Sequence, residues 1–529
     1  MPSGGIIQLS SSHENLDDED YLRKDYLHAR PKITYFKSVF RSYRNFGIET
    51  IPVQFDTKPS LSFDKPVTFV SDMDNIGHLL KSVYLIVDLP VLYPQTPSQQ
   101  ARQYEYVRNF ALNMIEYVEL RVGGQVIQEF SADWIYIYYK RYMTYEKYIE
   151  AIRNVEPYSR KLNDNYASAG TSAADTTTER LYVFLPFYFS KAVSFDSGSP
   201  STVLPFLNIQ YQSIYLSVRI RPVKAWLTYL EDNTQSPYYM KRVAPYVNND
   251  SSIFTTLMDR TNISLETQCY FLDPNGLNIL RAKPIVDYVV EYPFETTVRS
   301  TSDSSVSVSL LRRHALKEFW IVARRDDAYS RNTWNAYGTL EDETVGDDVR
   351  NSYDNVQSPY TPTSFLREYW LSLSTVINGR QTFRREIIES VDMYYNMENN
   401  TNRFLFRDMS AKRMRVLNGI VADDEGRHTY NTTVGDYLYG KTFSVRPTEG
   451  NPSGFCRVEG TTPTIVIRLS QLPPLKPLPP TSGSPHPAEF QPYSSTKNKS
   501  AFAYQYDVKV ISVHLVLVRI KGGILDFAT

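Results

Sequence analysis

The fold is first indicated by residues 116–130, which read Glu116-Tyr-Val-Glu-Leu-Arg-Val-Gly-Gly-Gln-Val-Ile-Gln-Glu-Phe130. Before the two glycines, Val118, Leu120 and Val122 alternate with Tyr117, Glu119 and Arg121. Alternation interrupted by glycine predicts two antiparallel strands joined by a tight turn, because such turns need positive φ. Residues 369–383 repeat the pattern as Tyr369-Trp-Leu-Ser-Leu-Ser-Thr-Val-Ile-Asn-Gly-Arg-Gln-Thr-Phe383. Gly124 and Gly379 lie about half the chain length apart, so we predict a β-domain present twice, with these turns in equivalent hairpins.

The composition is that of a large folded protein. A chain of 529 residues exceeds the size at which a single hydrophobic core stops growing, so we expect two large domains. Hydrophobic residues make up 42% and aromatic residues 14%, which suits packed cores. Tyrosine is abundant, with 41 residues against 26 phenylalanines. Tyrosine favours strands and also suits interfaces, and the sequence leaves both interpretations open.

Charge and cysteine content argue against several classes of protein. The net charge is −1 without a long basic run, so no direct nucleic-acid binding is expected. The short clusters Arg312-Arg313 and Arg324-Arg325 are interpreted as solvated strand ends. Two cysteines, Cys269 and Cys456, cannot form a disulfide framework or a four-cysteine zinc site, and they suit assembly in a reducing cytoplasm. Neither a signal peptide nor a long apolar run is apparent, so we expect a chain that is soluble when made.

The sequence contains no recognisable catalytic or metal-binding motif. The seven histidines do not pair at the spacings typical of metal sites, and the nucleophile-elbow, Walker and dinucleotide-binding motifs do not occur. Asp72 and Asp74 form an Asp-x-Asp pair, and residues 423–425 form an acidic trio, but neither has a complementary base nearby in sequence. We therefore predict that the protein is not an enzyme and has no catalytic, cofactor-binding or metal-binding residues.

The chain alternates strand signals with long loops. Strands are predicted at 83–89, 181–189, 214–220, 310–325, 464–469 and 504–520, and a helix at 145–153. Polar loops are predicted at 163–179 and 326–362. A proline-dense stretch at 472–492 reads as an extended surface loop, with a ligand for a polyproline-binding domain as the alternative. Strands joined by long excursions favour an all-β fold of the jelly-roll type.

The predicted boundaries divide the chain into four parts. Residues 1–30 form an N-terminal arm, 31–222 the first jelly roll, 223–262 a linker and 263–529 the second jelly roll. We expect the arm to be poorly ordered until a neighbour covers it. The loops 163–179, 326–362 and 472–500 are expected to carry the surface identity of the protein, because they are long and polar.

A series of motifs in this order resembles one family along nearly the whole chain. In the first half they are Gly4–Leu9, Pro31–Arg41, His78–Pro90, Val122–Gln125, Leu185–Phe189 and Leu204–Tyr211. In the second half they are Leu265–Asp273, Pro284–Glu295, His314–Trp320 and Asn451–Arg457. Together they resemble the double jelly-roll major capsid proteins of large nucleocytoplasmic DNA viruses. Ala315 replaces a usual proline, and the last motif lacks its Asn-Phe-Ser step, so the chain is identified as a divergent member.

The resemblance implies a viral structural protein with two tandem eight-stranded antiparallel jelly rolls and long loop insertions. It implies homotrimeric, pseudo-hexagonal capsomers that tile an icosahedral shell in the virion, made from chains synthesised in the host cytoplasm. The partners it implies are neighbouring capsomers and minor capsid or penton proteins, with an internal membrane as an open alternative. No cofactor is implied.

Two other hypotheses remain at this point. The first is the capsid protein of a smaller virophage or transposon-like virus. The second, disfavoured because signal peptide and cysteine pairs are lacking, is a carbohydrate-binding double β-sandwich, since a fold alone does not give a function.

Overall fold

The structure is a computed structural model, and it describes a defined part of the chain. The described residues are 46–74, 76–92, 104–143, 145–157, 178–190, 203–230, 242–245, 251–282, 285–299, 305–310, 315–325, 328–332, 334, 370–377, 380–385, 420–422, 428–430, 439–444, 454–458, 463–469 and 506–527. The predicted arm at 1–30 and the proline-dense stretch lie outside this set, as do Gly379, the acidic trio and almost all of the predicted loop at 163–179.

Two sheets form the first β-sandwich. The β1 sheet has the order β1-β12-β3-β7, and its strands are Phe46–Val53, Asn262–Leu272, Leu79–Pro90 and Thr178–Leu185, with the short β8 (Leu204–Pro205) beside β3. The β2 sheet has the order β2-β9-β5-β6, with strands Val67–Asp72, Ile214–Ile220, Ile115–Val122 and Gln125–Ser131. All of these pairings are antiparallel.

Two further sheets form the second sandwich. The β13 sheet has the order β13-β23-β15-β20, with strands Ile285–Arg299, Tyr506–Lys521, Ala315–Arg325 and Tyr439–Thr442. Short strands extend it, namely β21 (Cys456–Arg457) beside β15 and β24 (Ile524–Phe527) beside β23. The β14 sheet has the order β14-β22-β16-β17, with strands Ser305–Ser309, Thr464–Leu469, Trp370–Ile377 and Arg380–Arg385.

The two sandwiches have the same topology. If the main strands of each sandwich are counted along the chain, one sheet has the order first-eighth-third-sixth and the other second-seventh-fourth-fifth, in both halves. The hairpin β5–β6 is therefore equivalent to β16–β17, as the glycine patterns predicted. Gly123 and Gly124 have φ of 58° and 85°, the left-handed region that a tight turn needs. The predicted all-β double jelly roll is confirmed.

The predicted domain boundary is wrong by one strand. The sequence placed residues from 263 onward in the second jelly roll, but β12 pairs with β1 and β3 and completes the first. The connection between sandwiches is α8 (Pro274–Arg281), which begins where the Asp273 carboxylate accepts a hydrogen bond from the Gly276 amide at 2.8 Å. The alternation in β12 resembles that of any half-buried strand, so it does not reveal which sandwich the strand joins.

The remaining elements are short. The other helices are α4 (Phe110–Met114), α5 (Ala132–Tyr142), α6 (Tyr145–Val155), α7 (Ser251–Arg260) and α9 (Ala328–Arg331), with 3-10 turns at Phe206–Asn208 and Val223–Ala225. The small strands β4 (Glu105–Tyr106), β10 (Leu227–Leu230) and β11 (Arg242–Val243) form one sheet, and β18 (Ile420–Ala422) pairs with β19 (His428–Tyr430). The helix predicted at 145–153 is confirmed as α6.

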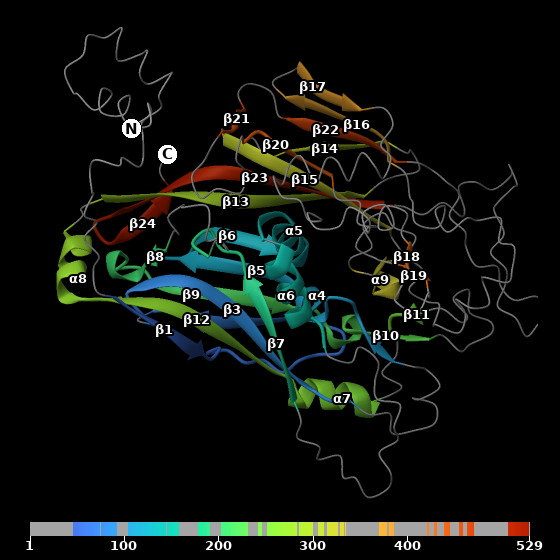
Figure 1. Ribbon diagram of the computed structural model, residues 1–529, viewed down its shortest axis with the longest axis horizontal. Helices are drawn as coiled ribbons and strands as arrows, with labels where there is room; N and C mark the ends of the chain where they lie inside the picture. The colour runs from blue at the N-terminus through green and yellow to red at the C-terminus, as the bar shows by residue number, and fades with distance from the viewer. Residues whose placement is uncertain are drawn as a thin grey trace, which may run out of the picture.

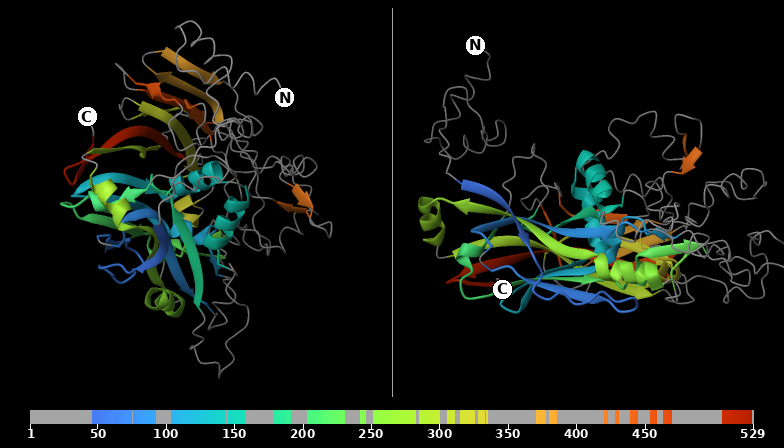
Figure 2. Two further views of the ribbon diagram at one scale, coloured as in Figure 1. Left: turned by 60° about the vertical axis from the view of Figure 1, so that its left-hand side comes forward. Right: turned by 90° about the horizontal axis from the view of Figure 1, so that it is seen from below.

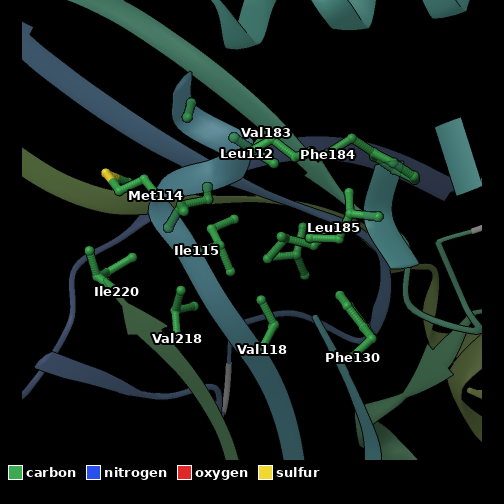
Figure 3. Packing of buried hydrophobic residues seen from close by; sticks show 14 of the residues in the cluster. Leu112, Met114, Ile115, Val118, Phe130, Val183, Phe184, Leu185, Val218 and Ile220 are labelled. Carbon is green, nitrogen blue, oxygen red and sulfur yellow. The ribbon is translucent and has the colours of Figure 1, made fainter. Parts of the chain in front are cut away.

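The sheets lie in layers, with the β14 sheet on one side of the molecule and the β1 sheet on the other (Figures 1 and 2). A large hydrophobic core fills the first sandwich; Figure 3 shows Val118 and Val218 of the β2 sheet and Leu185 of β7 among its residues. The same core continues across to Trp320, Ile511 and other residues of the β13 sheet. A separate core, which includes Val308 and Ile467, lies between the β13 and β14 sheets. The β13 sheet therefore buries apolar side chains on both faces.

Candidate functional site: the joint between the two sandwiches

The surface where the two sandwiches meet is called the joint, and α5 lies at its centre. This helix follows β6 of the first sandwich directly, with Ser131 as its N-cap residue. Its aromatic side chains are buried, and the Tyr139 hydroxyl donates to the carbonyl oxygen of Phe184 on β7 at 2.8 Å. These contacts fix the helix on its own sandwich, so that its two ends present polar side chains to the β13 sheet.

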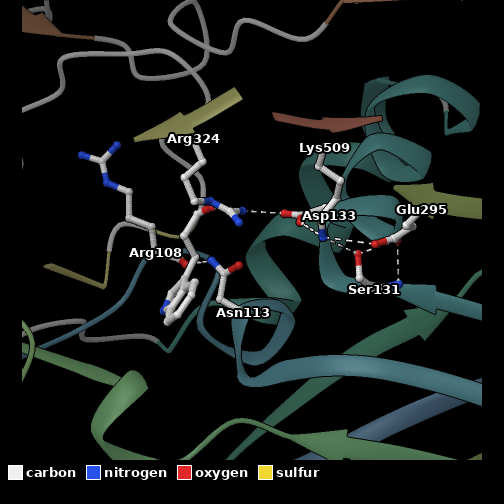
Figure 4. A network of polar contacts seen from close by, with 8 residues as sticks. Arg108, Asn113, Ser131, Asp133, Glu295, Arg324 and Lys509 are labelled. Carbon is white, nitrogen blue, oxygen red and sulfur yellow. Dashed lines mark hydrogen bonds and ion pairs between the residues drawn. The ribbon is translucent and has the colours of Figure 1, made fainter. Parts of the chain in front are cut away.

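At the N-terminal end of α5, an ionic cluster joins the sandwiches (Figure 4). The buried Asp133 carboxylate pairs with Arg324 of β15 and with Lys509 of β23, both at 2.6 Å. Glu295 of β13 pairs with Lys509 at 3.1 Å and accepts hydrogen bonds from the amide and hydroxyl of Ser131. The cluster thus balances two cations against two carboxylates. Burial alone would lower the pKa of Lys509, but Asp133 and Glu295 outweigh it and raise that pKa.

Arg324 corrects one sequence-based interpretation. The Arg324-Arg325 pair was expected to be a solvated strand end, yet Arg324 is buried. Its guanidinium also donates to the carbonyl oxygen of Trp334. A charged side chain is buried when a partner compensates it, and the partner Asp133 is far away in sequence. The sequence alone therefore gave no sign of the pairing.

A second ionic cluster lies at the C-terminal end of α5. Arg141 forms an ion pair with Glu318 of β15, and both side chains are fully buried. Lys317 pairs with Glu291 of β13 at 2.6 Å. The Tyr142 hydroxyl lies between the pairs, donating to Glu318 at 3.1 Å and accepting from Lys317 at 3.1 Å. Burial raises the pKa of Tyr142 well above its ordinary value, and the two glutamates raise it further, so it stays a neutral donor.

Aromatic rings complete the second cluster. Trp320 is fully buried, and its indole nitrogen donates to Glu318 at 3.3 Å. The guanidinium of Arg141 lies 4.9 Å from the centre of the Trp320 ring, within the range of a cation–π interaction. A desolvated cation and anion are thus held by each other and by rings. Removing one partner of such a pair costs about 3–5 kcal/mol, because the other charge is left buried.

Two further groups of contacts hold the ends of the joint. Near one end, the Gln212 side chain forms two hydrogen bonds with the backbone of Leu525 in β24. Its oxygen accepts from the Leu525 amide at 2.6 Å, and its nitrogen donates to the Leu525 carbonyl oxygen at 3.2 Å. Near the other, the Asn332 amide donates to the carbonyl oxygens of Lys224 and Leu227, both at 2.7 Å. The Trp334 indole nitrogen donates to the carbonyl oxygen of Ala225 at 3.1 Å. The Arg221 guanidinium lies 3.9 Å from the centre of the Trp334 ring. The joint is therefore tied in the middle and at both ends.

The start of the predicted loop at 326–362 thus differs from expectation. It was expected to be polar surface, but Asn332 and Trp334 are buried against the first sandwich. Asn332 has φ of 54°, a left-handed conformation that asparagine tolerates better than most residues. The tryptophan was a signal for burial that the polar composition of the surrounding stretch obscured.

The Asp-x-Asp pair has structural roles. Asp72 accepts a hydrogen bond from the Asp74 amide at 2.8 Å, and Asp74 accepts one from the Ile214 amide at 2.9 Å. Among the described residues, no group of three or more His, Cys, Asp or Glu side chains is arranged to hold a metal ion. Burial raises the pKa of the Cys269 thiol, which disfavours the reactive thiolate. No helix in the described part of the chain has both the length and the apolar character needed to cross a membrane.

Comparison with known proteins gives this architecture a family context. Residues 34–256 match the family described as "Major capsid protein N-terminus". The chain is 24% identical over 362 residues to the major capsid protein of Chrysochromulina ericina virus, covering 60% of this chain and 57% of that protein. Over these stretches the chain is similar in sequence to viral major capsid proteins. It is also 30% identical over 141 residues to probable capsid protein 4 of Acanthamoeba polyphaga mimivirus, covering 26% of this chain and 25% of that protein.

Most of the fold also matches a solved structure. VP54 of PBCV-1, in its crystal structure fitted into a reconstruction of the virophage Sputnik, has a TM-score of 0.59 and 15% identity to this chain. That match covers 94% of this chain and all of the solved chain, so it includes both sandwiches. At this identity the match shows the fold alone. The sequence matches span little more than half the length of the Chrysochromulina ericina virus protein and a quarter of the mimivirus protein.

Proposed function

We propose that this protein is a major capsid protein, a structural protein of the virion rather than an enzyme. The repeated strand order, in two sandwiches joined by a continuous buried joint, carries this proposal. The similarity to viral capsid proteins over residues 34–256 and over the whole fold supports it. A single chain with two sandwiches of the same topology supplies two similar building blocks.

In the proposed assembly, three chains form a closed ring. Cyclic symmetry limits growth, and three chains of two sandwiches each would place six similar lobes around one axis. Such an object would fill a sixfold position in a shell. Neighbouring capsomers and minor capsid or penton proteins are its proposed partners. The proposed site of synthesis is the host cytoplasm, and the proposed destination is the capsid.

The joint suits this role because it fixes the two sandwiches relative to each other. Each ionic cluster takes side chains from both sandwiches, and the pairs between them, Asp133–Arg324 and Arg141–Glu318 among others, hold their geometry only in one relative orientation. Lobes that rocked against each other would change the outline that neighbouring capsomers must fit. The buried pairs therefore favour one outline, although they contribute less to overall stability than apolar packing would.

Sedimentation of the purified protein tests the proposal. We expect a species of three times 61.1 kDa that persists on dilution to micromolar concentration. Its interfaces should be in the obligate range of roughly 2,000–5,000 Å² for each pair of chains. A stable monomer at that concentration, unchanged by salt or protein concentration, would contradict it.

A further inference from the structure

One end of the β13 sheet exposes apolar side chains. Ile285 and Val289 of β13, Leu517 of β23 and Ile524 of β24 are 39–49% exposed. Residues that lie opposite each other on neighbouring strands point to the same face of a sheet. Ile285 lies opposite Lys521, and Lys521 lies opposite Ile524. Val289 lies opposite Leu517, so all four apolar residues share one face. These four residues define the β24 face.

The opposite face of the same strands is buried. Ile520, Val518 and Leu525 alternate with the exposed residues and belong to the large core. Farther along the sheet, the β14 sheet covers the side away from the first sandwich, and its residues Val308 and Ile467 pack there in the second core. In Figure 1, the β14 sheet lies over the other end of β13 and β23 and leaves the end near β24 without a described element above it. The β24 face is thus an exposed apolar surface at the end of the sheet that the described part of the β14 sheet does not cover.

The chain begins its described course at the same end of the molecule. Phe46, the first described residue, pairs with Leu272 at the end of β12. Asp273 then caps α8, and β13 begins with Ile285 shortly after that helix. The 45 residues that precede Phe46 are therefore attached at the end of the molecule where β13 begins.

The sequence just before Phe46 suits an apolar surface of this kind. Ile33, Phe36, Phe40 and Tyr43 recur at intervals of three or four residues, a spacing typical of one apolar stripe. Lys37, Arg41 and Arg44 alternate with them at similar spacing. Such a segment would bury its apolar stripe and keep its basic side chains in water.

The size of the β24 face discriminates between occupants. Three adjacent strands are about 10 Å across, and the distance from Ile285 to Val289 along β13 is about 13 Å. These dimensions suit one peptide segment, because a helix with its side chains is about 10 Å in diameter. A stable interface with a second subunit needs roughly 800 Å² on each partner, far more than this face offers.

We propose that residues 31–45 of this same chain dock on the β24 face and cover it. The segment would then tie the start of the first sandwich to the second sandwich on the side away from the joint. The proposal is independent of capsid assembly, because both surfaces belong to one chain.

Thiol labelling tests the proposal directly. Val289→Cys reports on the β24 face, and Tyr215→Cys on β9 is the matched control, because both native side chains are 39% exposed. Both are made in a Cys456→Ser background, while Cys269 is buried. Labelling rates with a maleimide are compared between the full chain, a chain lacking residues 1–45, and a full-length variant with Ile33→Ser, Phe36→Ser and Phe40→Ser. A full-length Lys32→Ser, Lys37→Ser variant is the control for the segment.

We expect Val289→Cys to label at least ten times faster in the truncated chain and in the triple-serine variant than in the full chain. The lysine variant should match the full chain, and Tyr215→Cys should label equally in all. Equal rates at Val289→Cys in every chain would overturn the proposal. Protection of Val289→Cys from labelling that disappears when the protein is diluted would overturn the proposal too, because a second copy of the chain would then cover the β24 face. Sedimentation reports on trimer formation separately, so failure of either proposal can be recognised.

Discussion

Arg141 and Glu318 carry opposite charges where neither side chain reaches solvent. Arg141→Met should leave Glu318 buried without its cation and lower the free energy of unfolding by roughly 3–5 kcal/mol. Glu318→Gln should cost a similar amount, and the double variant should cost clearly less than the sum, because the two residues are coupled. Urea denaturation of the four proteins measures this.

The control for that experiment is the exposed pair Lys224–Asp64, whose side chains are 40% and 67% exposed. Lys224→Ala should cost at most about 1 kcal/mol, since exposed pairs are screened by solvent. Additive losses for Arg141 and Glu318 would contradict the coupling that the geometry predicts.

Lys509 makes the joint sensitive to alkaline pH. Its pKa is raised in the folded protein, so its contribution to stability is fully present below the pKa of an unfolded lysine, about 10.4, and is lost as pH rises through the higher folded value. The stability difference between the native protein and Lys509→Met should therefore be constant from neutral pH to about pH 10 and shrink above it. A difference that already shrank between neutral pH and pH 9 would show that the ammonium is not held by Asp133 and Glu295.

At the scale of elements, the two turn glycines should differ in their tolerance of a side chain. A Cβ on Gly124 meets nothing within 4 Å, so Gly124→Ala should cost about 1 kcal/mol, from its positive φ alone. A Cβ on Gly123 would lie 2.5 Å from the Gln212 side-chain amide, which also holds Leu525. Gly123→Ala should therefore destabilise the protein more. Thermal melts of the two variants would contradict this if the losses were equal.

The stretch after β15 should tolerate shortening only beyond Trp334. Removal of residues 335–362 should leave folding and sedimentation unchanged, because the buried anchor is kept. Trp334→Ala should cost about 3–5 kcal/mol, the usual range for a buried tryptophan, and should also remove the ring against which Arg221 lies. Unfolding midpoints in urea measure both, and a severe loss from the 335–362 deletion would show that this segment has a structural role of its own.

The sequence predicted strands better than it predicted α5. The strands at 214–220 and 464–469 were predicted with the bounds found, because alternation and flanking proline or loop residues define them locally. Residues 132–142 are rich in tyrosine, isoleucine and tryptophan, which favour strands, and their helical state depends on burial against β5, β6 and the β13 sheet. The joint could not be predicted for the same reason, since each of its pairs is made between residues distant in sequence.

At the scale of the whole molecule, the duplication could be predicted from the sequence because glycine turns are local features. The boundary between the two copies could not be predicted, because it depends on which strands pair. β12 closes the first sandwich although it directly precedes the connection to the second. The resulting chain has two equal topologies, a shared layer of core and an ionic joint. These features describe one block with two lobes, which is the unit that the proposed capsomer requires.

In the proposed capsomer, three such blocks close into a six-lobed ring. Electron-microscopy projections of the purified protein test this arrangement. We expect threefold particles whose outline shows six similar lobes, with the two lobes of each chain in one fixed orientation. Particles with two lobes each at micromolar concentration, or lobes whose relative orientation varies among particles, would contradict it.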